Sequence, residues 1–159
     1  MPRLRYEAAD QAAPITEPPA SAACYSCYTQ LLARSYSQPV YRGVHQMVVD
    51  AYNAQHPGGR EHRAVQAVAV CLMTLCLFLE DGVDPAEGSR LHKAMADRPV
   101  FTWLPAPDLY GLMTAADVLV VADPAGHERL VRAWAGEVWQ AWAVQHDTVH
   151  GWLAAGHFR

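Results

Sequence analysis

One uncharged segment, AVQAVAVCLMTLCLFL from Ala64 to Leu79, constrains the fold more than any other part of the chain. Its 16 residues are short of the roughly 20 that a helix needs to cross a bilayer. The segment is apolar on nearly all sides, which is typical of a helix that other elements surround. We therefore predict a central buried helix in a chain of 159 residues, which is long enough for one domain with its own core.

Proline and glycine divide the rest of the chain into further helices. Pro39 can open a helix that is stopped by the turn at 57–59, and a second helix is expected over 61–80. A third, shorter helix is expected over 85–96. Three prolines and a glycine among large apolar residues at 98–113 predict an irregular loop that covers core surface.

Two capping patterns mark the C-terminal part of the chain. Thr114 and Asp117 form a variant of the capping box before a short helix. Asp123 is an N-cap residue followed by Pro124, and the pattern from there sustains one helix of roughly 30 residues to about Ala155.

Signals for strands are weak, so we predict an all-α fold. The expected architecture is a single-domain helical bundle of four or five main helices over 23–159, beginning with a Cys-x-x-Cys metal knuckle. Residues 1–22 hold four prolines among small and charged residues and are expected to form a flexible arm.

Composition excludes several classes of partner. A formal net charge of −4 and a pI near 6.0 provide no general attraction for nucleic acid or anionic membranes. The N-terminal segment lacks the apolar core of a secretion signal, so a cytoplasmic location is expected. Four cysteines in such a chain favour metal ligation or simple burial over disulfides, and Cys71 and Cys76 are interpreted as core residues.

Cys24 and Cys27 form the Cys-x-x-Cys pair, directly after the proline-rich segment. Such a pair can provide two thiolates to one metal ion, and a structural zinc site needs two further ligands. Redox chemistry of the thioredoxin type is an alternative, although that motif normally follows a strand in a βαβ pattern. A pair of unligated thiols is the third interpretation.

Histidines on apolar helix faces are the candidates for the missing ligands. His146 lies in the apolar stripe of the last predicted helix, and His150 follows one turn later in the i, i+4 relation that can bind one ion. One buried and one solvated histidine is the simpler alternative for this pair. His45 lies in the apolar stripe of the helix after Pro39, and His56 returns to that face about 16 Å further along.

Only one of His45 and His56 can therefore join the cysteine pair. We predict a zinc ion, Zn2+, bound by Cys24, Cys27, His45 and His146, with His150 as the alternative fourth ligand.

Other polar and aromatic residues are weaker candidates. Asp50 lies about 140° around its helix from His45, so we expect it to be solvated or to support a ligand rather than bind metal. Tyr52, Asn53, Gln55 and His56 gather where the helix ends, either as a small pocket or as a capped terminus. Four tryptophans at helical spacing are expected in the core and on an aromatic face that could form a homodimer: Trp134, Trp139, Trp142 and Trp152.

Several strings resemble a family of small, functionally uncharacterised bacterial proteins that begin with a Cys-x-x-Cys pair. They are YRGVHQMVVDAYNAQHPGG, AVQAVAVCLMTLCLFLEDG, WLPAPDLYGLMTAADV and WAGEVWQAWAVQHDTVHGWL, and VDAYNAQHP is the most specific part. The resemblance covers nearly all the chain after Ala23 and implies a single domain without an assigned activity. It also implies functional roles for five residues: Cys24, Cys27, His45, His56 and His146.

The expected topology is similar to that of the DinB/YfiT-like metal-binding four-helix bundles, whose metal triad His45, His146 and His150 would match. The Cys-x-x-Cys pair departs from that group, because two thiolates and two imidazoles leave no position for substrate. The sequence therefore predicts a zinc-binding helical protein with a structural metal. The alternatives are a metal-dependent enzyme of hydrolase or thiol-transferase type, or a protein-interaction module with an exposed aromatic face.

Overall fold

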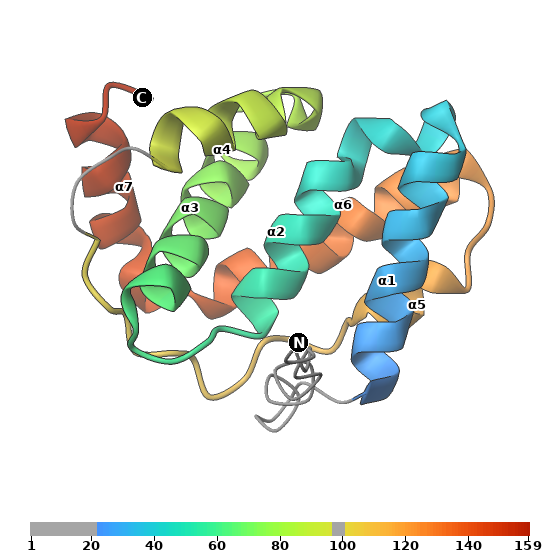
Figure 1. Ribbon diagram of the computed structural model, residues 1–159, viewed down its shortest axis with the longest axis horizontal. Coiled ribbons are helices and arrows are strands. Elements are labelled where there is room, and N and C mark those ends of the chain that lie inside the picture. The colour runs from blue at the N-terminus through green and yellow to red at the C-terminus, as the bar shows by residue number, and fades with distance from the viewer. Residues whose placement is uncertain (1–21, 97–100) are drawn as a thin grey trace, which may run out of the picture.

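The computed structural model describes residues 22–96 and 101–159, and these form one all-α domain without strands (Figure 1). This confirms the predicted all-α single domain, although the described residues form seven α-helices rather than the four or five main helices expected. The α-helices are α1 (Ala22–Ser37), α2 (His45–Gln55), α3 (His62–Leu79), α4 (Gly88–Ala96), α5 (Ala115–Leu119), α6 (Pro124–Ala141) and α7 (His146–Ala155). Short 3-10 helices precede three of them: η3 (Pro39–Val44), η4 (Pro85–Glu87) and η5 (Ala143–Gln145).

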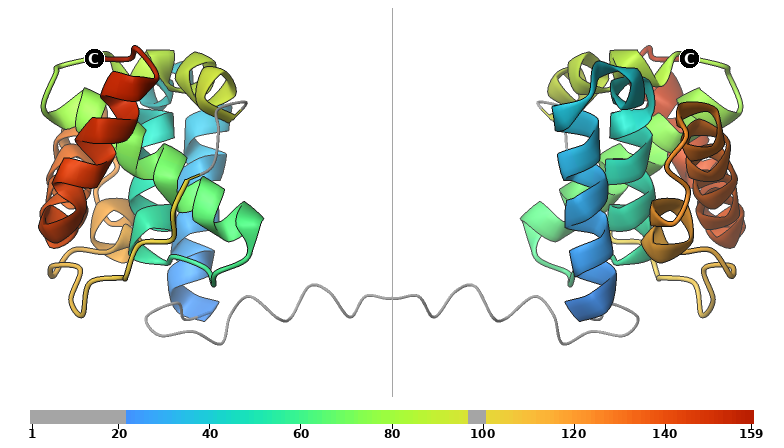
Figure 2. Two further views of the ribbon diagram at one scale, coloured as in Figure 1. Left: turned by 90° about the vertical axis from the view of Figure 1, so that its left-hand side faces the viewer. Right: turned by 90° about the vertical axis from the view of Figure 1, so that its right-hand side faces the viewer.

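The helix predicted from the apolar segment is α3, and it lies in the middle of the domain. Every residue from Ala69 to Phe78 is buried. Helix α2 packs against both α3 and α6, α1 packs against α2 and α5, and α7 packs against α3. As a result α1 and α7 lie on opposite sides of the molecule, separated by α2 and α3 (Figures 1 and 2).

By length and composition alone, α3 would also qualify as a membrane span. However, 61% of its apolar window is buried inside the domain, as expected for the core helix of a globular fold. The helix therefore owes its apolar character to packing against its neighbours.

Local capping chemistry matches the sequence in the C-terminal part of the domain. Thr114 and Asp117 form the predicted capping box at the start of α5, and the Asp123 side chain accepts a hydrogen bond from the Gly126 backbone at the start of α6. Residues 101–113 contain no helix or strand, as predicted. Residues 1–21 of the predicted arm and residues 97–100 of the irregular segment lie outside the described residues.

The prediction of a single helix from Pro124 to about Ala155 is wrong, because the chain turns at Trp142. This residue is buried, and its indole Nε1 donates to the backbone oxygen of Ala54 at 3.0 Å. Helix α6 ends directly before it, and η5 then leads into α7. The break allows α6 to pack against α2 while α7 packs against α3.

The structure does not show the predicted Cys-x-x-Cys knuckle, because Cys24 and Cys27 lie inside α1. Together with Tyr28 and Leu31 they follow the i, i+3, i+4, i+7 spacing of an apolar helix face. These side chains pack against the core. The two cysteines are therefore half-buried on the core-facing side of a regular helix of 16 residues.

Gly88, the first residue of α4, allows that helix to approach α2 closely. A Cβ atom at this position would lie only 2.2 Å from Cγ of Gln46. His92 follows one turn later on the same helix, so the close approach at Gly88 also determines where the imidazole of His92 lies.

We expect Gly88→Ala to lower the free energy of unfolding by about 1–3 kcal/mol, because the added methyl group must displace Gln46 or α4. The matched control is Gly136→Ala in α6, where a Cβ meets nothing within 4 Å. That change should raise stability by about 0.5–1 kcal/mol, since alanine favours a helix interior. Urea unfolding of both variants measures the effects, and a Gly88→Ala protein as stable as the parent would contradict this description of the α2–α4 contact.

Candidate metal centre

Three helices bring Asp50, Cys71 and His92 together in the interior of the domain. Their potential ligand atoms, one from each of α2, α3 and α4, all lie within 4.8 Å of one another. Asp50 and Cys71 are buried, whereas the His92 side chain remains 26% exposed. The group therefore has a carboxylate, a thiol and an imidazole at one point, with its exposed edge at His92.

Several hydrogen-bonding side chains lie close to Asp50 and His92. The His92 Nε2 atom lies 2.8 Å from Asp50 Oδ1, and Thr74 donates its hydroxyl to Asp50 Oδ2 at 2.6 Å. The Gln46 amide donates to Asp50 Oδ1 at 3.0 Å. The same amide nitrogen and the Thr74 hydroxyl lie 3.1 and 3.2 Å from His92 Nε2.

A ring nitrogen carries either one proton or one lone pair, so His92 Nε2 does not bond all three neighbours at once. When Nε2–H donates to Asp50 Oδ1, the Gln46 amide donates to the same oxygen and the Thr74 hydroxyl donates to Oδ2. These hydrogen bonds are complete without a metal, and a cation would replace the direct Asp50–His92 contact, with carboxylate, thiolate and imidazole as its ligands.

The negative charge of the buried Asp50 carboxylate is suited to a bound cation. A fully buried carboxylate is costly unless a positive charge or several hydrogen bonds compensate it. Within the described ranges Asp50 forms one ion pair, with His92, and that pair requires a protonated imidazole. Burial, and then the charge and hydrogen bond of Asp50, raise the pKa of Cys71 well above its ordinary value, so the thiol is protonated when no metal is bound.

Cys76, Glu80 and His150 form a second group with ligand atoms within 4.8 Å of one another. The Arg159 guanidinium already lies 3.2 Å from Glu80, and Trp139 and His150 also hydrogen-bond that carboxylate. Burial alone would raise the pKa of Glu80, but hydrogen bonds from Cys76 and Trp139 and the interaction with His150 outweigh it and lower the pKa. A metal ion here would have to compete with Arg159, so the Asp50 group is the better candidate.

The structure does not bring the predicted zinc ligands together. Cys24 Sγ lies 3.6 Å from His56 Nε2, whereas His45 Nε2 lies 3.4 Å from the hydroxyl of Tyr36. Cys24 and Tyr36 are separated by twelve positions of α1, or about 18 Å along its axis. The cysteine pair and His45 are therefore at opposite ends of the α1–α2 contact.

His146 and His150 lie on α7, on the far side of the domain from α1 (Figure 1). Their rings are 6.1 Å apart, as expected for the i, i+4 spacing. His146 stacks on Trp139 at 3.7 Å and hydrogen-bonds its backbone oxygen, while His150 contacts Glu80. Neither histidine approaches Cys24 or His45, so the structure assembles neither the four-ligand site nor the three-histidine triad.

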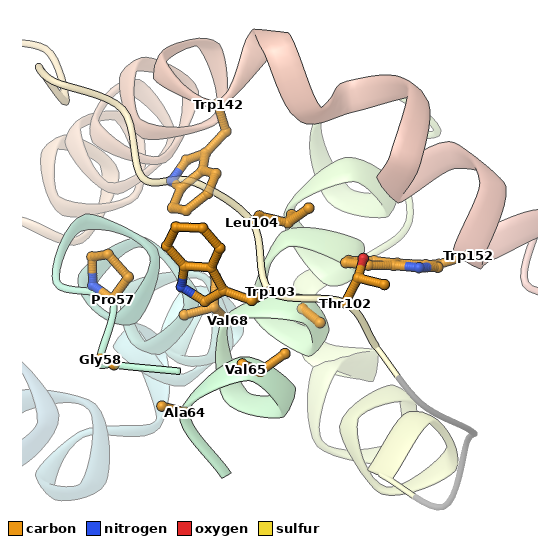
Figure 3. A pocket seen from close by; sticks show the side chains of 12 residues that line it. Pro57, Gly58, Ala64, Val65, Val68, Thr102, Trp103, Leu104, Trp142 and Trp152 are labelled. Atoms are coloured by element: carbon orange, nitrogen blue, oxygen red, sulfur yellow. The ribbon is translucent and has the colours of Figure 1, made fainter. Parts of the chain in front are cut away.

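A separate, small apolar cleft lies between the turn at 57–59, α3 and the segment 102–104 (Figure 3). Its lining includes Trp103, Trp142 and Trp152, and none of its twelve lining residues is charged. The Arg60 guanidinium covers the outer face of Trp103 at 3.8 Å. Such a cleft lacks the converging polar groups that orient a substrate, so we interpret it as a packing seam between the loop and α3.

The comparison with family models agrees with this domain. A model described as a family of unknown function, DUF5946, matches residues 8–143. The chain belongs to the DUF5946 family. No curated protein and no solved structure gives a significant match. This confirms the predicted membership of a functionally uncharacterised family, and DUF5946 brings no activity with it.

The sequence does not predict the Asp50 group: its pattern indicates that Asp50 is solvated or supports a ligand and that Cys71 lies in the core, and it singles out nothing at His92. One signal is present, because Thr74 is a polar residue inside the apolar stretch from Ala67 to Leu79, three positions after Cys71. A polar side chain at such a position needs a buried partner, which is Asp50.

The second group predicts a specific alkaline sensitivity. Burial, followed by the charge and hydrogen bond of Glu80, raises the pKa of Cys76 from 9.0 to about 12. The unfolded chain loses this proton near pH 9.0 while the folded chain retains it, so the stabilisation is complete below pH 9.0 and is lost as the pH rises toward 12.

We expect the stability of the parent protein to fall relative to Cys76→Ser by about 1.4 kcal/mol per pH unit above pH 9. Urea unfolding of both proteins from pH 8 to 10.5, with reductant and chelator present, measures the difference. Parallel pH profiles would show that the thiol is not held in its protonated form by the fold.

Proposed function

We propose that the protein binds one divalent transition-metal ion through Asp50, Cys71 and His92, and that the ion has a structural role. The observation that carries this proposal is the convergence of three ligand types around a fully buried carboxylate. Zinc is the expected metal, because a mixed set of oxygen, sulfur and nitrogen ligands suits it.

The neighbouring polar groups support this assignment. Thr74 contacts Asp50 Oδ2 at 2.6 Å and Gln46 contacts Oδ1 at 3.0 Å, so both orient the carboxylate. Groups that hold a ligand in this way are typical of metal sites. The Thr74 hydroxyl oxygen, which lies 3.2 Å from His92 Nε2, is a nearby oxygen that could complete a four-coordinate ion.

A structural role follows from where the ligands lie. Asp50, Cys71 and His92 belong to three different helices, and His92 brings the short helix α4 to this point. An ion that joins them would fix α4 against α2 and α3. Because the unfolded chain offers no preformed site, binding free energy would appear as folding stability.

The second candidate function is metal-dependent catalysis, which the ligand count favours. Three protein ligands leave one position for water in catalytic zinc sites. The partly exposed His92 places that position near the surface. A cobalt-substituted protein separates the two roles, since azide changes the visible spectrum of an open site and leaves that of a closed four-ligand site unaltered.

Metal content provides the first test of the site. Protein purified without an affinity tag should contain about one zinc ion per chain by plasma mass spectrometry. Cys71→Ser and His92→Ala should each remove most of the metal. Cys76→Ser and His150→Gln, the matched changes in the second group, should retain it. Full occupancy in both Cys71→Ser and His92→Ala would exclude the Asp50 group as the binding site.

Chelation tests the structural role. Removal of the ion should lower the melting temperature of the parent protein by several degrees, and readdition of zinc should restore it. The effect should weaken as the pH falls, because the thiol and the imidazole must lose their protons to bind. His92→Ala serves as the control and should melt at the same temperature with and without chelator. An unchanged melting curve after confirmed metal loss from the parent would leave catalysis as the better account.

A further inference from the structure

A third group of reactive side chains, distinct from the two candidate metal-binding groups, lies where the end of α2 packs against the beginning of α1. The Sγ atom of Cys24 is 3.6 Å from Nε2 of His56, and Nδ1 of His56 is 2.9 Å from the backbone oxygen of Tyr52. A carbonyl oxygen only accepts, so Nδ1 carries the hydrogen and Nε2 presents its lone pair to the thiol. Cys24 therefore donates its S–H to His56.

Aromatic packing holds the imidazole in this orientation. The His56 ring lies 4.2 Å from the ring of Tyr52, which stacks on Tyr28 at 3.9 Å. Burial lowers the pKa of His56, against the opposing effect of the Tyr52 carbonyl, so the ring is a neutral base at pH 7. A base with its second nitrogen fixed by a third group is the arrangement that activates a cysteine nucleophile.

The thiol itself needs that base. Burial, followed by the charge of Cys27, raises the pKa of Cys24, while a hydrogen bond from the backbone of Ala115 lowers it. Cys24 is thus a thiol at neutral pH, and because both pKa shifts disfavour a resting thiolate–imidazolium pair, its proton moves to His56 only as the sulfur attacks. The Ala115 N–H would then stabilise the charge on sulfur.

Cys27 provides a second thiol within reach. Both cysteines of the pair are half-buried, whereas Cys71 and Cys76 are buried. Residues three apart on a helix have Cβ atoms about 5–6 Å apart, and a disulfide needs about 4 Å. Cys24 is the third residue of α1, and the N–H groups of a first turn have no partners within the helix, so this turn can adjust at low cost.

We propose that Cys24 and Cys27 form a dithiol–disulfide redox pair that reacts with small disulfides, with Cys24 as the attacking thiol and His56 as its base. The Cys24 proton moves to His56 Nε2 while sulfur attacks the substrate disulfide, which breaks and releases one thiolate. That thiolate takes the proton from His56, and a mixed disulfide remains on Cys24. Cys27 then attacks the Cys24 sulfur, and its proton passes to the leaving thiolate, which departs as the second thiol. The protein dithiol is thereby oxidised as the substrate disulfide is reduced to two thiols.

Metal binding by the same residues is the competing explanation. The ligand atoms of Cys24, Cys27 and His56 do not form a group within 4.8 Å, in contrast to those of Asp50, Cys71 and His92. This observation favours thiol chemistry, and the experiment distinguishes the two.

The test uses the full chain, reduced and then freed of reductant, with oxidised glutathione as the probe at pH 7. After acid quenching, peptide mass spectrometry should find a Cys24–Cys27 disulfide and two reduced glutathione molecules released per chain. Cys27→Ser should stop at a glutathione adduct on Cys24. His56→Gln should slow modification of Cys24 at least about tenfold, whereas His45→Gln, the matched change at the other end of α2, should not.

Three results would overturn the proposal. The first is a parent protein in which the Cys24 adduct persists without a Cys24–Cys27 bond. The second is a folded His56→Gln protein that reacts at the parental rate. The third is a zinc ion that is lost in both Cys24→Ser and Cys27→Ser but retained in Cys71→Ser, which would make the pair a metal half-site. If His56→Gln loses its helical circular dichroism, the comparison of the parent with Cys27→Ser decides the question alone.

Discussion

The buried carboxylate of Asp50 is the interaction on which the arrangement of the central helices depends. A charge in this position must be compensated, and the compensating groups come from three elements: Gln46 on α2 itself, Thr74 on α3 and His92 on α4. The surrounding side chains are apolar and cannot replace these contacts. Helix α4 is short, and burial of Leu91 and Met95 and the absence of a side chain at Gly88 let it pack close enough to α2 for His92 to reach the carboxylate.

The need to compensate a carboxylate charge also explains why the Glu80 group and the Asp50 group differ in chemistry. Near Glu80, a guanidinium from the C-terminal residue Arg159 compensates the carboxylate, so the fold itself provides the cation. Near Asp50 the fold provides neutral hydrogen-bond donors from Gln46 and Thr74, together with the imidazole of His92, but no guanidinium. The site that lacks a permanent positive charge is therefore the one where an external cation is expected to bind.

Much of the fold could be predicted from local sequence because its causes are local. The apolar run of α3, the capping residues Thr114 and Asp123, and the proline at the start of α6 each determine structure within a few residues. The break at Trp142 could not be predicted, because its cause is a hydrogen bond to Ala54 on a distant helix. The candidate site residues show the same difference between local and distant causes. The spacing of Cys24 and Cys27 is recognisable in the sequence. However, the histidine beside Cys24 is His56 rather than His45, because α1 and α2 run in opposite directions. His92 has no local signature at all, and only the packing of α4 brings it to Asp50.

The most direct test of the account is a crystal structure of the protein purified with its metal, with diffraction data recorded on both sides of the zinc absorption edge. The account predicts one anomalous peak at bonding distance, about 2.0–2.3 Å, from the carboxylate of Asp50, the sulfur of Cys71 and Nε2 of His92. A peak beside Glu80 and His150 or beside Cys24 would contradict it, as would zinc-free crystals in which Asp50 and His92 keep their direct ion pair.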